Sequence, residues 1–142
     1  MTEQERLNDG GAADVEYYPF PTKTLLPFSA AVRVGNMLYV SGQMGTDESV
    51  KIVPGGIEAE TRQTLANMKA ILERHGSSLD RVVKCTVMMA DMSEWPAMNA
   101  IYVQHFPNHL PARSAFGAAA LALGGRVEIE CMATIETTST QG

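Results

Sequence analysis

The sequence is short of cysteine, of long apolar runs and of basic charge, and each shortage excludes a class of protein. Its two cysteines, Cys85 and Cys131, fit no CxxC or Cys/His spacing, which argues against a disulfide scaffold and a zinc finger. Both lie in apolar, strand-like runs, so we expect two buried, reduced thiols of a cytosolic protein. A disulfide would require their strands to be adjacent with suitable geometry. No apolar stretch approaches the roughly 20 residues of a membrane-spanning helix. The N-terminal stretch has no apolar segment typical of a secretion signal, so we expect a cytoplasmic protein with no membrane partner.

Basic residues are outnumbered: 11 lysines and arginines stand against 16 aspartates and glutamates. An acidic surface repels phosphate backbones, so we expect no nucleic-acid partner. The three histidines, His75, His105 and His109, are not spaced with acids or cysteines as metal ligands would be. No glycine-rich phosphate loop is present either, so we expect neither a metal nor a cofactor.

The composition is that of an ordinary globular protein, because 45% of the 142 residues are apolar. A chain of this length is enough for one domain with a hydrophobic core. We expect a flexible N-terminal arm over 1–16, a single domain over 17–137 and a C-terminal tail over 138–142. The domain should begin with an extended, irregular stretch over 17–28, because that stretch carries three prolines.

Periodicity and turn residues predict the elements of this domain in the order ββαβαββ. The predicted strands are 29–34, 37–43, 81–90, 112–121 and 126–136, and the predicted helices are 57–74 and about 93–106. Gly35-Asn36 suits a tight hairpin turn, Gly76 suits the end of the first helix, and Ser93 can cap the second. This order predicts an α+β domain in which two helices pack on one face of a mixed sheet.

The last predicted strand separates two faces. Its odd-numbered residues from Val127 to Ile135 are apolar or small, whereas Glu128 and Glu130 fall on the other face. If the last two strands pair as a hairpin, Arg113 and Glu128 point to the same face but lie roughly 20 Å apart along the strand. They could then share a site only if a second chain met this face.

Four positions are chemical candidates, each with a plainer alternative. Arg113 opens a strand of small residues, and its guanidinium could hold a carboxylate, although spacing alone favours a surface arginine. Glu128 could hold a water molecule, although its position alone favours a solvated glutamate on an open sheet face. Gly42, after Ser41, would let a ligand approach the backbone, or the strand simply ends there. Asn99 offers both a donor and an acceptor, but it is more often just a polar helix position.

Several blocks of the sequence resemble the Rid (YjgF-type) family over about residues 26–136. They are LPFSAAVRVGNMLYVSGQ (26–43), the helix and strand over 55–87, DMSEWPAMNAIY (91–102), PARSAFG (111–117) and RVEIECMA (126–133). The resemblance implies a chorismate-mutase-like fold and a homotrimer with its sites between subunits. It also implies hydrolysis of reactive 2-imino or enamine acids to 2-oxo acids and ammonia without a cofactor.

The resemblance assigns roles residue by residue. It implies that Arg113 binds the carboxylate of a small substrate and that Glu128 lies near the reacting water. The substrate-binding residues that it implies are Phe28, Ser41, Gly42, Asn99 and Ala115.

Three positions depart from the family pattern: Phe28 replaces the usual Tyr, Ala115 replaces Cys or Thr, and Gly117 replaces a glutamate. The alternative function is therefore a non-catalytic module that binds 2-oxo acids or similar carboxylates in the same cleft. A ribonuclease activity, ascribed to some relatives, fits less well, because the chain is acidic and shows no nucleophile–base pair.

Overall fold

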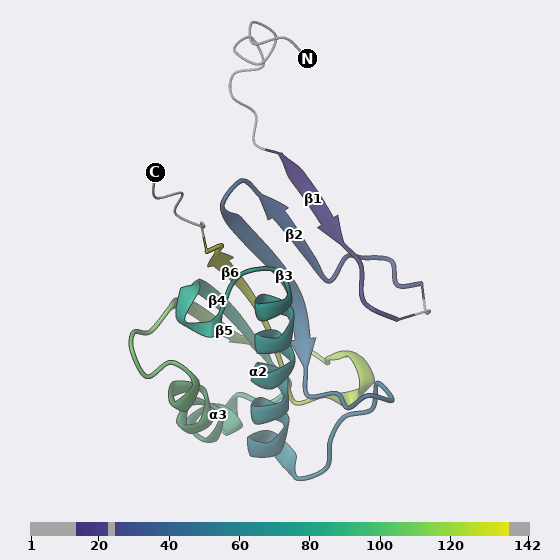
Figure 1. Cartoon of the computed structure of the whole chain (residues 1–142). Coiled ribbons are helices and arrows are strands. Elements are labelled where there is room, and N and C mark those ends of the chain that lie inside the picture. Colours follow the sequence, from purple (N-terminus) through teal and green to yellow (C-terminus); the bar gives the residue numbers. More distant parts are fainter. Residues whose placement is uncertain (1–13, 23–24, 137–142) are drawn as a thin grey trace, which may run out of the picture.

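The computed structural model describes residues 14–22 and 25–136, which form one six-stranded sheet with two helices on one of its faces (Figure 1). The strands are β1 (Val15–Tyr18), β2 (Ala31–Val34), β3 (Met37–Met44), β4 (Val82–Met89), β5 (Ala112–Gly117) and β6 (Val127–Thr134). The helices are α2 (Gly56–Arg74) and α3 (Trp95–Tyr102). Single 3-10 turns follow at η1 (Leu79–Arg81), η2 (Met92–Glu94), η3 (Val103–His105) and η4 (Ala122–Gly124).

The long helix α2 confirms the prediction for 57–74. Its buried residues recur every three or four positions, from Ile57 to Leu72, so one side of the helix packs on the sheet. Gly76 lies just beyond its end with a φ of 82°, and the Ser77 N–H donates to the Leu72 carbonyl at 2.9 Å. Glycine is the residue that most readily takes this left-handed conformation, which is why the helix ends there.

The second predicted helix is shorter and begins differently. It divides into η2, α3 and η3, with Pro96 in the first turn of α3 as predicted. The predicted cap at Ser93 is wrong: the Asp91 carboxylate instead accepts the Ser93 N–H at 2.9 Å. Asp91 is extended, as a cap residue must be, whereas Ser93 already lies inside the 3-10 turn.

The strand order is β1-β2-β3-β6-β4-β5, so β6 lies between β3 and β4. The predicted hairpin of the last two strands is therefore wrong. β5 pairs with β4 in parallel, and residues 118–126 pass the end of β4 to reach β6. The Ala118 N–H still donates to the Met89 carbonyl of β4 at 2.8 Å, and β5 itself ends at Gly117, so the predicted strand over 112–121 is too long.

The first strand, β1, was not predicted. It is an edge strand that pairs antiparallel with β2, and its residues are mostly exposed, so it has no alternation of buried and exposed side chains to reveal it. The predicted arm over 1–16 thus overlaps the sheet at Val15 and Glu16. Residues 1–13 of the arm and the predicted tail over 138–142 lie outside the described residues.

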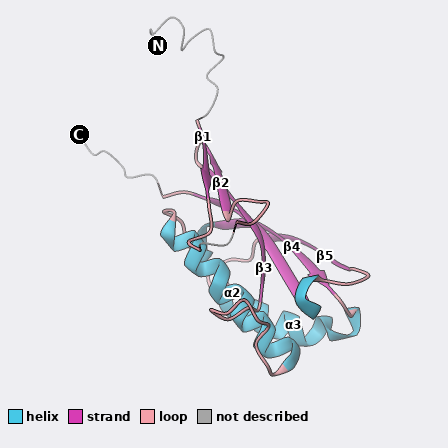
Figure 2. Ribbon diagram, turned by 90° about the vertical axis from the view of Figure 1, so that its right-hand side faces the viewer, coloured by secondary structure: helices cyan, strands magenta, loops and turns pink. Residues whose placement is uncertain are grey.

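The core lies between the helices and the sheet, and the other sheet face is open (Figure 2). The odd-numbered residues of β6 are buried beneath the helices, as the alternation predicted. Cys85 and Cys131 lie directly opposite each other on β4 and β6, and both are free and buried, which confirms the predicted thiols. Within the described ranges, no helix is long and apolar enough to cross a membrane.

Candidate active site

Glu128 lies over Gly42 on the open face of the sheet. A Cβ atom at position 42 would collide with the Glu128 carboxylate, so a larger residue fits there only if this side chain moves away. The sequence suggested that Gly42 makes room for a ligand. In the structure, the group that occupies the room is the carboxylate of Glu128.

A β-bulge places Gly42 at this point. Val40 pairs with Cys131 and Gln43 pairs with Ile129, so Ser41 and Gly42 together oppose the single residue between them on β6. The Ser41 hydroxyl donates to the Ser29 carbonyl at 2.6 Å, which fixes the bulge against the preceding segment. The hydroxyl of Ser41 is therefore used in a structural hydrogen bond. We refer to Ser41, Gly42 and Glu128 together as the glutamate cluster.

The Glu128 carboxylate is half-buried, and its surroundings favour the protonated form. Burial raises its pKa above the ordinary value for a glutamate, and the negative charge of Glu130 raises it further. A carboxylate with a raised pKa takes up a proton more readily near neutral pH, which suits a general base.

Arg113 lies elsewhere, on the edge strand β5 beneath α3. Its guanidinium carbon is 4.8 Å from the centre of the Tyr102 ring and 6.0 Å from that of the Trp95 ring. The side chain is half-buried, yet within the described part of the chain it has no hydrogen bond and no ion pair. A half-buried cation without a partner anion is uncommon, and its fork of N–H donors is available to a ligand.

Asn99 and Ala115 border Arg113. Asn99 stands four residues after Trp95 and three before Tyr102, on the same side of α3, and its Oδ1 is buried without a partner among the described residues. Ala115 lies two residues beyond Arg113 on β5 and shares its face. We name Trp95, Asn99, Tyr102, Arg113 and Ala115 the arginine cluster.

The two clusters lie on opposite faces of the sheet. Arg113 is level with Cys85 and Cys131, both buried beneath the helices, whereas Glu128 is three residues from Cys131 along β6. Side chains an odd number of residues apart point to opposite faces, so the prediction that Arg113 and Glu128 share a face is wrong. The mistaken hairpin register caused the error.

Phe28 belongs to neither cluster by direct contact. It is 53% exposed, and its ring packs edge-on against Phe20 with 5.6 Å between the ring centres. The next residue, Ser29, accepts the hydrogen bond from Ser41, so Phe28 adjoins the segment that fixes the bulge.

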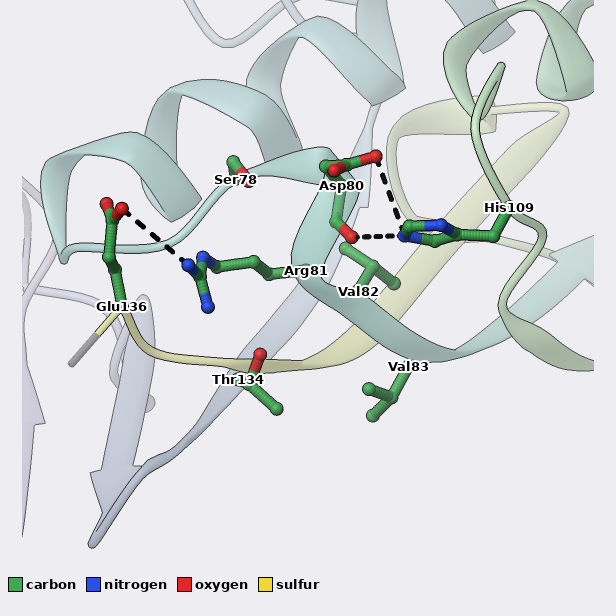
Figure 3. Close-up of a pocket in the computed structure, with 8 residues that line it drawn as sticks. All are labelled: Ser78, Asp80, Arg81, Val82, Val83, His109, Thr134 and Glu136. Carbon is green, nitrogen blue, oxygen red and sulfur yellow. Dashed lines mark hydrogen bonds and ion pairs between the residues drawn. The ribbon is translucent and has the colours of Figure 1, made fainter.

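A separate hollow of about 540 Å³ lies where β4 begins and β6 ends (Figure 3). Its charged groups already pair with each other: Arg81 contacts Glu136 at 3.6 Å, and the His109 ring lies 3.5 Å from an Asp80 oxygen. It therefore offers a ligand no unpaired buried charge, in contrast to Arg113.

Two aromatic residues of the arginine cluster were missed as site residues. The sequence patterns assigned no chemical role to Tyr102 or Trp95. Their spacing of seven residues, two helical turns, was the available signal. Among the described residues, no group of three or more histidines, cysteines or acids could hold a metal ion.

Comparison with known proteins gives a consistent result. Residues 21–135 match the model of the family described as Endoribonuclease L-PSP. A 2-iminobutanoate/2-iminopropanoate deaminase of Capra hircus is 46% identical over 108 residues, covering 75% of this chain and 79% of that protein. A solved structure of RidA from an Antarctic Psychrobacter is 38% identical, with a TM-score of 0.75, covering 87% of this chain and 98% of that one. The solved structure of a Rid-family protein of Yersinia pestis is 32% identical, with a TM-score of 0.79, and the match covers 86% of this chain and 100% of that one.

Proposed function

This chain belongs to the Endoribonuclease L-PSP family, the Rid family that its motifs resemble, and we propose that it hydrolyses reactive 2-imino or enamine acids to 2-oxo acids and ammonia. The observation that carries the proposal is the half-buried guanidinium of Arg113, which has no anionic partner within the described residues. The similarity to a protein named as a 2-iminobutanoate/2-iminopropanoate deaminase supports the same reaction.

In the proposed reaction, Arg113 holds the substrate carboxylate through two charge-assisted hydrogen bonds. Glu128 accepts a proton from a water molecule while the water oxygen attacks the carbon of the C=N bond. Glu128 then passes this proton to the nitrogen, which gives a carbinolamine. As the C–N bond breaks and the C=O bond forms, Glu128 takes the hydroxyl proton and transfers it to the leaving nitrogen. Ammonia leaves, Glu128 is again ionised, and no cofactor is needed.

The other predicted residues have supporting roles in this proposal. Asn99 Oδ1 is a buried acceptor without a partner among the described residues, suited to an N–H of the imine. The exposed ring of Phe28 and the small side chain of Ala115 would border the carbon chain of the substrate. Ser41 and Gly42 would hold the backbone on which Glu128 rests.

One chain cannot supply both halves of this site, because Arg113 and Glu128 lie on opposite faces. We therefore propose that three copies assemble through their open sheet faces, and that Arg113 of one copy meets Glu128 of the next. Apolar side chains on the open face support an interface there: Tyr39, Met132 and Phe116 are 42%, 40% and 49% exposed. We expect this homotrimer to act in the cytoplasm on a small carboxylate, without a nucleic-acid or membrane partner.

The test generates imines in situ with an amino-acid oxidase and measures the release of 2-oxo acid and ammonia. We expect the protein to accelerate release, and Arg113→Ala to reduce kcat/KM by roughly a hundredfold, since each hydrogen bond to a charged group contributes about 1.5–3 kcal/mol. Arg81→Ala, which removes an arginine paired with Glu136 outside the site, is the matched control and should behave as the unmodified protein.

Release at the spontaneous rate would contradict the deaminase proposal. The alternative function, a module that binds carboxylates without turnover, is favoured by the missing hydroxyl at Phe28. It would show as a rise in Tm with 2-oxobutanoate that Arg113→Ala abolishes, in a protein that releases no ammonia.

A further inference from the structure

The guanidinium of Arg113 is held by two aromatic rings rather than by an acid. Its central carbon lies 4.8 Å from the centre of the Tyr102 ring and 6.0 Å from that of the Trp95 ring. Both distances fall within the roughly 6 Å over which a cation is attracted to a ring face. Among the described residues, the guanidinium has no hydrogen bond and no ion pair, and its electrostatic partner besides the rings is the neighbouring thiol of Cys85.

The two rings come from one helix face. Trp95 and Tyr102 are the first and last residues of α3, seven residues and therefore about two turns apart, so both rings can face β5. Tyr102 is only 3% exposed and packs against Phe106 with 4.8 Å between the ring centres, which fixes its orientation. Trp95 is 39% exposed and lies at the solvent side of the guanidinium.

A ring face holds a cation without accepting its N–H bonds. An aspartate or glutamate in the same place would use two of the five donors of the arginine, and would compete with a substrate carboxylate for them. Cys85, level with Arg113 on β4, introduces no negative charge either, because burial raises the pKa of its thiol. The environment therefore restrains Arg113 while leaving its donors unused.

We propose that Trp95 and Tyr102 are positioning residues that hold the Arg113 guanidinium in the orientation required for binding the substrate carboxylate. The role of this orientation in catalysis rests on the proposed function, whereas the aromatic contact itself does not. Removing a ring should weaken carboxylate binding and raise KM, and should leave kcat nearly unchanged, because Arg113 makes the same contact before and during the reaction.

The experiment compares four variants in binding of 2-oxobutanoate, measured by calorimetry, and in kcat and KM. Trp95→Leu and Tyr102→Leu remove a ring face, and Trp95→Phe and Tyr102→Phe keep one. We expect each leucine variant to raise Kd and KM roughly threefold to tenfold, as loss of a partly desolvated cation–π contact predicts. The phenylalanine variants should stay close to the unmodified protein.

Phe106→Leu is the matched control, because it removes a ring that touches Tyr102 but is not in contact with Arg113. It should lower Tm while leaving Kd unchanged. Leucine variants with unaltered Kd, or with no greater loss than Phe106→Leu, would overturn the proposal.

A second readout separates this inference from the proposed function. The NMR resonance of the Arg113 Nε–H, assigned with Arg113→Lys, should show a ring-current shift that shrinks in both leucine variants. If the shift is present but 2-oxobutanoate does not bind, the deaminase proposal fails while the aromatic restraint of Arg113 stands. If the shift is absent, the restraint itself is refuted, whatever the activity.

Discussion

The arginine cluster and the glutamate cluster are built in different ways. The arginine cluster relies on one helix face above an edge strand, and its charged group has no polar partner among the described residues. The glutamate cluster relies on a bulge in the middle of the sheet, where Glu128 rests on a glycine. One cluster exposes donors and the other a proton acceptor, and the sheet separates them. In the enzyme that we propose, these two clusters would be complementary halves of one site, and the assembly of separate chains would unite them.

The largest predicted effect tests that union directly. Arg113→Ala and Glu128→Gln should each lower kcat/KM by roughly a hundredfold or more when pure, because one loses the carboxylate grip and the other the base. When equal amounts of the two variants are unfolded, mixed and refolded together, the mixture should recover about a quarter of the activity of the unmodified protein. In random assemblies, about one intersubunit site in four receives an intact Arg113 from one chain and an intact Glu128 from the next.

A mixture no more active than the two variants alone would contradict a site shared between chains. The control mixes each variant with an inactive chain that lacks both groups, and this mixture should recover nothing.

A smaller effect is expected from Gly42→Ala, which damages only the glutamate cluster. Its methyl group would displace the Glu128 carboxylate and lower kcat roughly tenfold, because the base would be misplaced. The free energy of unfolding should change little, because the Glu128 side chain can move aside. Binding of 2-oxobutanoate should persist, because Arg113 is untouched. Gly117→Ala is the matched control: its added carbon would approach the flexible Met92 side chain at 3.1 Å rather than a carboxylate. An equal loss of kcat in both variants would contradict the inference that Gly42 makes room for the Glu128 carboxylate.

The pH dependence of stability provides a third test. The pKa of Glu128 is raised in the folded state by burial, so folding favours its protonated form. Its contribution to stability is therefore present below the ordinary glutamate pKa and is lost as pH rises through the higher, folded value. Glu128→Gln should raise Tm relative to the unmodified protein above neutral pH and not at pH 4. A Tm difference that does not vary with pH would contradict this.

The smallest effect concerns Glu130, whose charge is the second cause of the raised pKa of Glu128. Glu130→Gln should shift the acid limb of the pH profile of kcat/KM to lower pH, without changing the plateau. Glu136→Gln, on an acid that pairs with Arg81 away from the cluster, serves as the control and should leave the limb in place. An unmoved limb in Glu130→Gln would show that another group controls it.

Local patterns predicted most of the elements, because those patterns arise from contacts close in sequence. The recurrence of apolar residues every three or four positions from Ile57 to Leu72 predicted α2. The alternation of apolar and charged residues from Val127 onward predicted which side of β6 is buried. The exposed strand β1 could not be predicted from its own sequence, because its residues show no alternation of buried and exposed side chains. It is a strand because it pairs with β2.

Pairing between distant strands could not be predicted in the same way. Nothing within residues 112–136 indicates that β6 passes its neighbour in sequence and inserts between β3 and β4. The face assigned to Arg113 was wrong for this reason, although its identity as a candidate came from its chemistry. Similarly, Glu60 is buried near the start of α2, and its carboxylate accepts the Arg126 backbone N–H at 2.8 Å, a contact between residues far apart in the sequence that no local pattern indicates.

The central position of β6 has a consequence for how the chain folds. Until residues 127–134 are synthesised, β3 and β4 each have an unpaired edge. The strand that joins the two halves of the sheet is the last of the described strands in chain order. The hairpin of β2 and β3 can form early from local contacts, but the complete sheet requires contacts across almost the whole described chain. We therefore expect nascent chains that end before Val127 to bind chaperones and to aggregate readily, and β6 to complete folding in a single late step.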